Sequence, residues 1–492
     1  MRASARNRNT KNMYLAESIK FNDVRITSAS EAELLALTSD PYLPKIRLEE
    51  ALPSLQTAVI VTPTDVIARA KLGLTFRLLD RFKEAEAELF EAARLVSGPG
   101  SEVIYNLLGL TLCEQGYFNK ALPLFEAALR QNPNHKESRE NQRLANLLLE
   151  RDGPSIELYT RDHIFSSDEM AYLFKVSLFD QKKYSEAWDW IRQYRRHTGS
   201  TTLGPEWQGD DPHGKTILII HEFMGLGDGF FNIRFIPLLA AMGARVIILA
   251  PLTLARLFST VPGVSTVASE VERLPPYDLT AYMLDLPHFL MGDLAVPPTP
   301  VPFLTAFSED VAVWRERLRN VSGLKIGIAY SGGIHPKRIA FHRHFRRHCA
   351  LDQFSSLADL PGVTLINLQM DAAKSQISSS GVPVLDYTEN INDYADTAAL
   401  ICNLDLVITV DTSIAHCAGA LGKPVWILLQ YGIAALWPTD DSDYPWYPSA
   451  RLFHQPEPGN WELTFAAVAL EVGDLLKKLS SVSAGDGVIT SS

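Results

Sequence analysis

The pattern of apolar and polar positions changes near residue 204. Between about residues 61 and 200, apolar residues recur at the spacing of three and four that is typical of amphipathic helices. From residue 215 onward, short runs rich in Val, Ile and Leu alternate with turns and helical segments. The stretch 204–214 between them is rich in Gly, Pro and Asp. The pattern therefore predicts a helical part followed by an α/β part.

The helical part contains an internal repeat. Segments Ile67–Val96 and Ile104–Asn132 superpose when Gly73 is aligned with Gly109, 36 residues further on. The matched positions are apolar or small: Leu72 with Leu108, Phe76 with Leu112, Phe82 with Phe118, Ala85 with Ala121, Leu89 with Phe125 and Ala92 with Ala128. This spacing resembles the tetratricopeptide repeat, whose period is about 34 residues. An unrelated bundle of helical hairpins is the alternative.

We expect repeats over residues 61–200, with a third, weaker copy at Met170–Tyr194. Repeat solenoids bind peptides or proteins, but the fold alone does not identify the partner. Residues 1–60 are mixed and polar, so we expect a partly disordered extension there, with one short helix at Ser30–Leu37.

Six apolar runs of the α/β part are the size of buried strands. They are Thr216–Ile220, Val246–Leu249, Ile326–Ala329, Thr364–Leu368, Leu406–Val410 and Val425–Leu429. Strands that alternate with helices predict parallel sheets. The Pro-rich segment 296–302 separates two such halves, and a ligand is expected at the carboxyl ends of their strands.

Charge and cysteine content narrow the class of protein. The 492 residues include 46 Lys and Arg against 57 Asp and Glu, a net charge of −11, which argues against a general nucleic-acid binder. The four cysteines are scattered and predict no disulfide framework. The N-terminus resembles no secretory signal, and no apolar run has the ~20 residues that a membrane-spanning helix needs. We therefore expect a cytoplasmic protein without an integral membrane segment.

The first chemical candidate follows the first strand of the α/β part. Gly225 and Gly227 permit a tight turn and close backbone approach, and Asp228 precedes a helix expected near Phe230. Asp228 is also well placed simply to cap that helix.

The second candidate ends the strand Leu406–Val410. Asp411 lies where ligands collect, Thr412 and Ser413 offer hydroxyls and amides to a phosphate, and His416 is one helical turn further on. The alternative is a Ser/Thr cap with a buried structural histidine.

The third candidate is a basic cluster in this acidic chain. Between residues 335 and 348 it contains Lys337, Arg338, Arg343, Arg346 and Arg347. A solvated loop is the alternative. The His342-x-His344 pair lacks an acidic or Cys ligand to complete a metal site.

The run Asp393–Trp426 resembles the C-terminal half of bacterial tetratricopeptide-repeat glycosyltransferases, which are relatives of the heptosyltransferase-like family (glycosyltransferase family 9) with the GT-B fold. Supporting matches are Gly225–Asp228, Leu368-Gln369, and 443–448 followed by Arg451-Leu452-Phe453. The resemblance implies an α plus α/β protein: a tetratricopeptide-repeat solenoid followed by a GT-B fold of two Rossmann-like domains. Their expected bounds are 205–318 on the acceptor side and 319–480 on the nucleotide-sugar side, with a disordered tail at 481–492.

The resemblance also implies roles for individual residues. Asp228 matches the general base that acts on the acceptor hydroxyl. Asp411, Thr412, Ser413 and His416 match the loop that holds the donor diphosphate, Gln369 falls near the nucleoside, and Arg347 aligns with a family arginine. Helix dipoles and basic side chains serve in place of a metal, so no metal and no cofactor is expected.

Some positions depart from the family pattern. Relatives often have Lys where this chain has Met370, Trp where it has Tyr330, and Arg where it has His454. The segment 434–437 lacks an Arg that relatives often have before the Trp. The expected function is metal-independent transfer from a nucleotide-sugar donor to a protein acceptor recruited by the repeats, with flagellin as a candidate acceptor. The alternatives are a lipopolysaccharide-type transferase and a catalytically inactive repeat scaffold.

Overall fold

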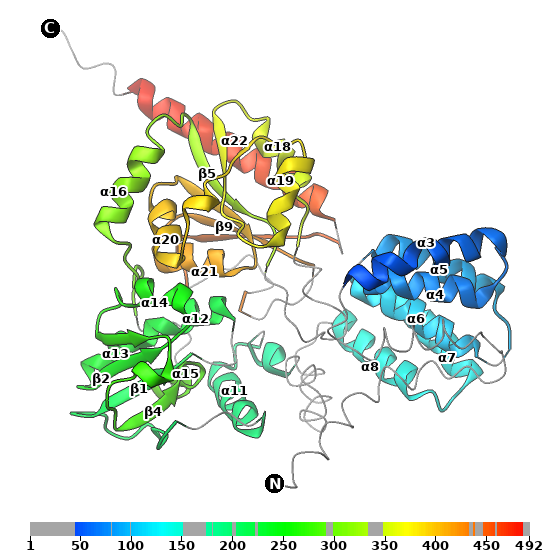
Figure 1. Ribbon diagram of the computed structural model, residues 1–492, viewed down its shortest axis with the longest axis horizontal. Helices are drawn as coiled ribbons and strands as arrows, with labels where there is room; N and C mark the ends of the chain where they lie inside the picture. Colours follow the sequence, from blue (N-terminus) through cyan, green and yellow to red (C-terminus); the bar gives the residue numbers. More distant parts are fainter. Residues whose placement is uncertain are drawn as a thin grey trace. The chain divides into compact units, whose positions relative to one another are not determined.

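The chain forms two compact units in the computed structural model (Figure 1). The described residues are 45–79, 81–98, 100–150, 174–179, 181–198, 203–221, 225–291, 299–332, 348–431, 436–437, 446–457 and 460–485. Those up to residue 150 form the helical unit, and those from residue 174 onward form the α/β unit. Each unit is described by itself.

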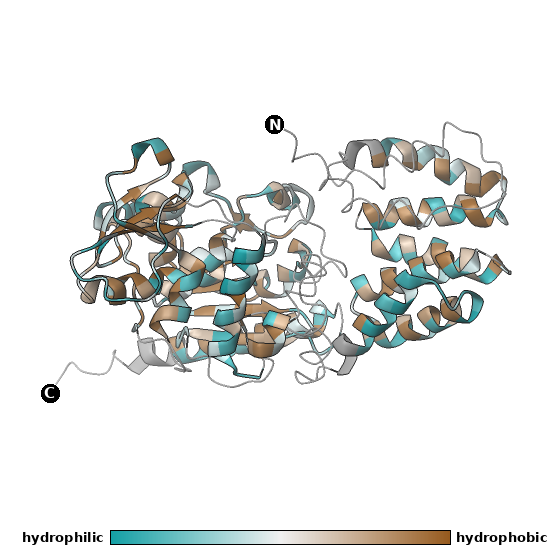
Figure 2. Ribbon diagram, turned by 90° about the horizontal axis from the view of Figure 1, so that it is seen from below, coloured by the Kyte–Doolittle hydropathy of each residue, from teal (hydrophilic) through white to brown (hydrophobic). Residues whose placement is uncertain are grey.

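The helical unit is a series of helices in which each packs against the next. They are α3 (Lys45–Val61), α4 (Val66–Leu78), α5 (Phe82–Leu95), α6 (Ser101–Glu114), α7 (Phe118–Gln131) and α8 (Lys136–Glu150). In Figure 2 these helices carry both brown and teal residues, as expected when one face is buried. The predicted repeats therefore correspond to the helix pairs α4–α5 and α6–α7.

The two aligned glycines lie where the paired helices touch. A Cβ at Gly73 would lie 2.7 Å from Cγ of Leu89, and a Cβ at Gly109 would lie 2.6 Å from Cε1 of Phe125. Neither position has room for a side chain, so glycine allows the helices of each pair to approach. The same packing buries Ala85 and Ala121 completely.

The helix α3 corrects the expectation of a polar extension through residue 60. Its Leu48, Leu52 and Val59 are buried and belong to the same apolar cluster as Leu72 of α4. Pro53 lies inside this helix. Because proline usually ends or kinks a helix, its presence argued against a helix in this part of the sequence. The helix expected at Ser30–Leu37 lies outside the described residues.

The first half of the α/β unit contains a four-stranded parallel sheet. Its strands are β1 (Thr216–Ile220), β2 (Arg245–Leu249), β3 (Val264–Ala268) and β4 (Leu279–Tyr282), in the order β3-β2-β1-β4. The connecting helices are α12 (Leu226–Asn232), η2 (Ile233–Phe235), α13 (Ile236–Ala241), α14 (Leu252–Phe258), η3 (Val271–Arg273), η4 (Met283–Asp285) and α15 (Leu286–Leu290).

The second half contains a six-stranded parallel sheet. Its strands are β5 (Leu324–Ala329), β6 (Val363–Asn367), β7 (Val384–Leu385), β8 (Leu406–Val410), β9 (Val425–Leu429) and β10 (Ala450–His454), in the order β10-β9-β8-β5-β6-β7. Counted within this half, the order reads 6-5-4-1-2-3, which is the strand order of the dinucleotide-binding Rossmann fold. The four strands of the first sheet, in the order 3-2-1-4, match the corresponding part of the Rossmann strand order. The predicted fold class, helical repeats followed by two Rossmann-like halves, is confirmed.

Helices surround and join the two sheets. They are α16 (Ser308–Arg317), η5 (Leu351–Phe354), α18 (Ser355–Ala358), η6 (Ala372–Ser375), α19 (Gln376–Ser379), η7 (Thr388–Asn390), α20 (Tyr394–Cys402), α21 (Ser413–Ala420) and α22 (Trp461–Gly485). In Figure 1, α12 and α14 of the first half lie beside α21 and α20 of the second, and these two pairs are in contact. Among the described residues, no helix combines the length and apolar character needed to cross a membrane.

A helical hairpin precedes the first sheet and packs against the helices that follow β4. Residues 174–179 are helical, and α11 (Tyr184–Thr198) follows and contacts η4 and α15. This is the place of the expected third repeat copy, but its partner here is the α/β unit. Residues 174–198 belong to the α/β unit. The expected boundary at residue 200 stays a prediction.

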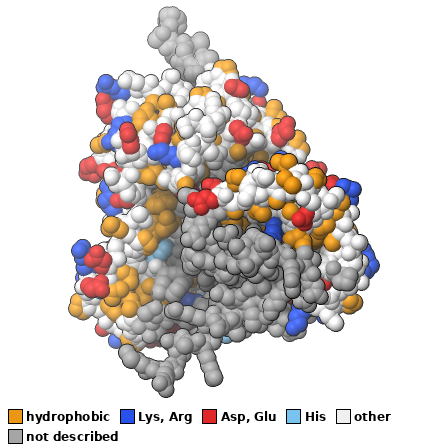
Figure 3. Space-filling view, turned by 45° about the vertical axis from the view of Figure 1, so that its right-hand side comes forward, with side chains coloured by type: hydrophobic (Ala, Val, Ile, Leu, Met, Phe, Trp, Pro, Cys, Tyr) orange, Lys and Arg blue, Asp and Glu red, His pale blue; other side chains and the backbone are white. Residues whose placement is uncertain are grey.

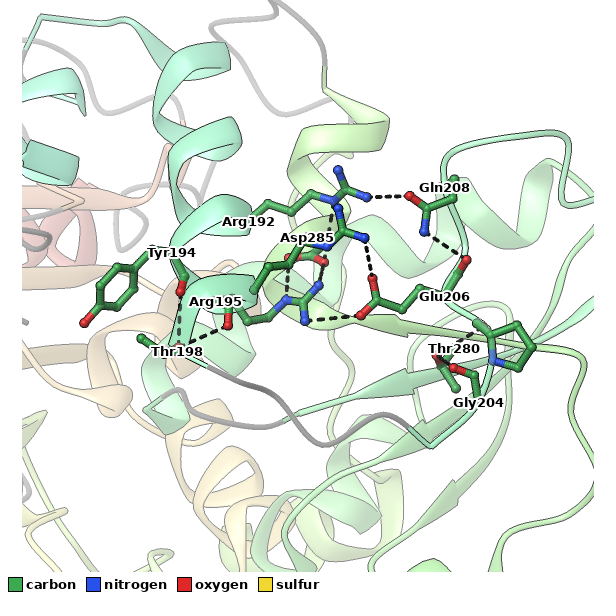
Figure 4. Close-up of polar contacts among 11 residues, drawn as sticks. Arg192, Tyr194, Arg195, Thr198, Gly204, Glu206, Gln208, Thr280 and Asp285 are labelled. Carbon is green, nitrogen blue, oxygen red and sulfur yellow. Dashed lines mark hydrogen bonds and ion pairs between the residues drawn. The ribbon is translucent and has the colours of Figure 1, made fainter. Parts of the chain in front are cut away.

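A buried ion pair fastens α11 to the first half (Figure 4). Arg195 Nη2 lies 2.5 Å from Asp285 Oδ2, and its Nε donates to Oδ1 at 3.1 Å. The Arg195 guanidinium also lies 3.5 Å from Glu206 and 3.8 Å from the centre of the Tyr282 ring. The side chains of Arg195 and Asp285 are only 3% and 4% exposed, so the pair is desolvated.

Candidate functional site

The helices that carry the two main candidate motifs touch each other. A Cβ at Gly227, in α12, would lie 2.9 Å from Cδ2 of His416 and 3.7 Å from Cα of Ser413, both in α21. The helix α12 follows the carboxyl end of β1, and α21 follows that of β8. These strands border the point where each sheet reverses its order. Ligands of open α/β sheets bind at this point.

Asp228 lies in the first turn of α12, which begins at Leu226, earlier than expected from the sequence. Its Oδ2 accepts a hydrogen bond from the backbone N–H of Gly225 at 3.0 Å, so it does cap the helix. The side chain is half-buried. A carboxylate fixed in this way is oriented, and a group that accepts a proton from a substrate hydroxyl needs a fixed orientation.

Asp411 and the hydroxyl groups after it have partners within the protein. The indole Nε1 of Trp437 donates to Oδ1 of Asp411 at 2.8 Å. The Thr412 hydroxyl accepts from the Ile414 N–H at 3.2 Å, and the Ser413 hydroxyl pairs with that of Tyr394. The side chains at the start of α21 are therefore held in place by contacts within the protein.

His416 is buried among aromatic rings. Its Nδ1 lies 3.1 Å from the hydroxyl of Tyr447, and its ring stacks on Trp437 at 5.0 Å between centroids. The ring of Phe231, from α12, meets it edge-on at 6.2 Å. His416 thus supports Trp437, which in turn holds Asp411, and this agrees with the structural alternative for the histidine.

Gln369 braces two strand ends of the second half. Its Oε1 accepts from the N–H groups of Tyr330 and Ser331 at 3.1 and 2.9 Å, and its Nε2 donates to the Ser331 carbonyl and to Asp371. The side chain is buried. These contacts hold the first residues of the loop after β5.

Two groups not expected from the sequence lie near Asp228. His221 directly follows β1, burial lowers its pKa, and its Nε2 has no hydrogen-bond partner within the described part of the chain. Lys175 lies in the hairpin before the first sheet. Burial lowers the pKa of Lys175, whereas the charges of Asp228 and Asp411 act in the opposite direction.

Arg347 and the basic cluster around it lie outside the described residues, as do His342 and His344. Within the described ranges, no group of three or more His, Cys, Asp or Glu side chains is arranged to hold a metal ion. On the face seen in Figure 3, acidic and basic side chains are interspersed.

Comparison with known families decides the nature of the helical unit. Two models described as tetratricopeptide repeat match residues 47–102 and 103–135. The helical unit is a tetratricopeptide-repeat domain. The first match includes most of α3, in agreement with the packing of this helix against α4.

Comparisons with individual proteins and solved structures give more distant similarities. Protein FlbA of Caulobacter vibrioides is 26% identical over 455 residues, which cover 84% of this chain and 74% of FlbA. A glycosyl transferase family 9 structure from Veillonella parvula is 13% identical over 55% of this chain and 90% of its own, with a TM-score of 0.37. An O-GlcNAc transferase from Thermobaculum terrenum is 13% identical over 92% of both chains, with a TM-score of 0.29. The strand order of each sheet identifies the two halves as Rossmann-like.

Proposed function

We propose that the chain is a glycosyltransferase that moves a sugar from a nucleotide-sugar donor to an acceptor recruited by the tetratricopeptide repeats. The observation that carries the proposal is the contact of α12 with α21, because it brings Asp228 and the start of α21 to one place. Two Rossmann-like strand orders and the resemblance of Asp393–Trp426 to such transferases support it.

The proposed chemistry divides between the two halves. Asp228 takes the proton of the acceptor hydroxyl as that oxygen attacks the anomeric carbon of the donor sugar. The bond from this carbon to the departing diphosphate breaks, and the diphosphate carries the electron pair away. Backbone N–H groups at the start of α21 stabilise its charge, with Asp411, Thr412 and Ser413 shaping that turn. We propose that Arg347 adds a positive charge and that no metal ion takes part.

We propose a protein acceptor, with flagellin as the candidate named from family resemblance, and a cytoplasmic location for the reaction. The repeat domain supports a polypeptide acceptor, since helical repeats offer extended surfaces suited to peptides. A lipopolysaccharide-type acceptor and an inactive scaffold are the competing functions.

Donor binding gives the first test. Nucleotide sugars with each common base are added to the full chain, and thermal unfolding is followed by tryptophan fluorescence. A donor at 100 times its Kd raises the free energy of unfolding by about 2.7 kcal/mol. Because all eight tryptophans lie between residues 188 and 461, the signal comes from the α/β unit alone. Unfolding that no nucleotide sugar shifts contradicts the proposal.

Acceptor choice needs a second experiment. A chain that begins at residue 153 retains the hairpin with Arg195 and lacks the repeats. We expect this chain to bind the donor but not to modify a protein acceptor. Modification of the protein at the full-length rate would contradict recruitment by the repeats.

A further inference from the structure

A buried arginine lies directly after α12, in the short helix η2. The side chain of Arg234 is completely inaccessible to water. Its Cζ atom lies 4.7–5.4 Å from the centres of four aromatic rings, which belong to Phe231, Phe303, Trp446 and Tyr447. Contact with aromatic faces offsets part of the cost of burying a guanidinium, but an apolar side chain would fill the same space without that cost. Packing of the core alone therefore does not explain an arginine at this position.

Two hydrogen bonds of the guanidinium connect the two Rossmann-like halves. Nε of Arg234 donates to the carbonyl of Phe231 at 2.8 Å, and Nη1 donates to the carbonyl of Trp446 at 3.0 Å. The first carbonyl belongs to the last turn of α12, and the second belongs to the segment that leads into β10. The hydroxyl of Thr299 donates to the carbonyl of Arg234 itself at 2.7 Å. Because the donors of a guanidinium form a rigid fork, these bonds fix Trp446 relative to α12.

The next residue along the chain, Tyr447, lies against α21. A Cβ at Gly419 would lie 2.6 Å from Cδ1 of Tyr447, so the phenol ring packs directly on the backbone of this helix. The Tyr447 hydroxyl is 3.1 Å from Nδ1 of His416, which lies one turn nearer the start of α21. The segment that Arg234 holds is therefore also the segment that holds His416.

We propose that Arg234 is a positioning residue for donor binding and acts through Tyr447. The contacts continue from Tyr447 to His416, from His416 to the stacked ring of Trp437, and from Trp437 to Asp411 at the start of α21. This inference rests on the proposed function, which places the donor diphosphate at that helix end. The competing explanation is that Arg234 only stabilises the contact between the two halves.

The test compares nucleoside diphosphates with their nucleosides, because only the diphosphate reaches the start of α21 in the proposed function. Affinities of the full chain for UDP, ADP, GDP, CDP and dTDP, and for the matching nucleosides, are measured by titration calorimetry. The variants are Arg234→Met, Tyr447→Phe and the double variant. One control is Arg273→Met, whose side chain is 77% exposed. The other is Tyr277→Phe, which removes a hydroxyl that donates to the carbonyl of Leu203.

A shared route through Tyr447 predicts losses that do not multiply. We expect Arg234→Met to weaken the bound diphosphate about tenfold and Tyr447→Phe about threefold, with the nucleoside changed less than about twofold in each. The double variant should resemble Arg234→Met, whereas independent effects would multiply to about thirtyfold. Both controls should match wild type. Urea unfolding followed by tryptophan fluorescence establishes that each variant is folded under the conditions of the titration.

The outcomes separate this inference from the proposed function. Wild-type diphosphate affinity in Arg234→Met overturns the role of Arg234, and so does an equal loss for nucleoside and diphosphate, which indicates a general distortion. Losses that multiply in the double variant overturn the route through Tyr447. Each of these results leaves the proposed function standing, whereas a wild-type chain that binds none of the diphosphates contradicts both. If Arg234→Met does not fold, Arg234→Lys, which keeps the charge without the fork, takes its place in the same comparison.

Discussion

Replacing Arg195 by Met tests whether the hairpin is a structural part of the α/β unit. The guanidinium makes two hydrogen bonds to Asp285, and both side chains are nearly inaccessible to water. Met fills a similar volume without charge. The variant therefore leaves the Asp285 carboxylate buried with its main partner gone. Among the described residues, Arg192 at 3.9 Å is the basic side chain that remains paired with it.

The expected loss is large because an uncompensated charge stays buried. Removing one member of a buried pair costs about 3–5 kcal/mol of the free energy of unfolding. The control is Arg196→Met, whose side chain is 51% exposed and lies 3.5 Å from Glu206. A surface pair of this kind contributes roughly 0–1 kcal/mol. The two neighbouring substitutions should therefore differ several-fold in cost.

The cost should also depend on pH. Burial already raises the pKa of Asp285, and Arg195 opposes that rise. Without Arg195 the folded-state pKa rises further above the unfolded value of about 3.9. The folded state then binds the proton more tightly, so the stability of the variant falls as pH increases from about 4. Arg195→Met should therefore cost less at pH 4.5 than at pH 7.5, whereas Arg195→Met/Asp285→Asn should show little such dependence.

Urea unfolding followed by tryptophan fluorescence measures these differences, since this signal reports on the α/β unit. A cost below about 1 kcal/mol for Arg195→Met at pH 7.5 would refute the reasoning, because it would mean that the pair is not desolvated. A cost that is the same at both pH values would refute the assignment of the loss to a buried Asp285 carboxylate.

Three further predictions follow from the packing and from the proposed chemistry. Gly109→Ala forces a Cβ against Phe125 and should destabilise the repeats by about 1–3 kcal/mol in circular dichroism, and an unchanged melting curve would contradict this packing. Gly227→Ala, which meets His416, should lower donor turnover, whereas Gly473→Ala, which meets nothing within 4 Å, should not; equal turnover in the two variants would count against the α12–α21 contact. A chelator should leave turnover unchanged, and loss restored by a divalent ion would contradict metal-free transfer.

The sequence predicted elements well where they are buried and regular. Strands such as Leu406–Val410 and Val425–Leu429 were recognised at their observed bounds, because central parallel strands are continuous apolar runs. The strands β3, β4, β7 and β10 were missed, and each of them lies at the edge of its sheet. The helix α3 was missed because Pro53 interrupts its pattern.

The candidate site was predictable only in part. Local pattern located Asp228 and Asp411, because ligand-binding residues of α/β sheets follow strand ends. It could not assign His416 to its aromatic surroundings, since Trp437 and Tyr447 approach it from more than 20 residues away. Arg234 carries no local signal, because its place depends on Trp446, which lies 212 residues further along the chain.

The most direct test of the central claim compares turnover with donor binding in Asp228→Asn. Asparagine can still accept the hydrogen bond from the Gly225 N–H, so the first turn of α12 is preserved. Release of nucleoside diphosphate from the bound donor is measured with acceptor present, beside wild type and Asp352→Asn, an exposed carboxylate in η5. We predict that Asp228→Asn lowers kcat by about 10²–10⁴-fold with donor Kd unchanged. Wild-type turnover in Asp228→Asn would contradict the account.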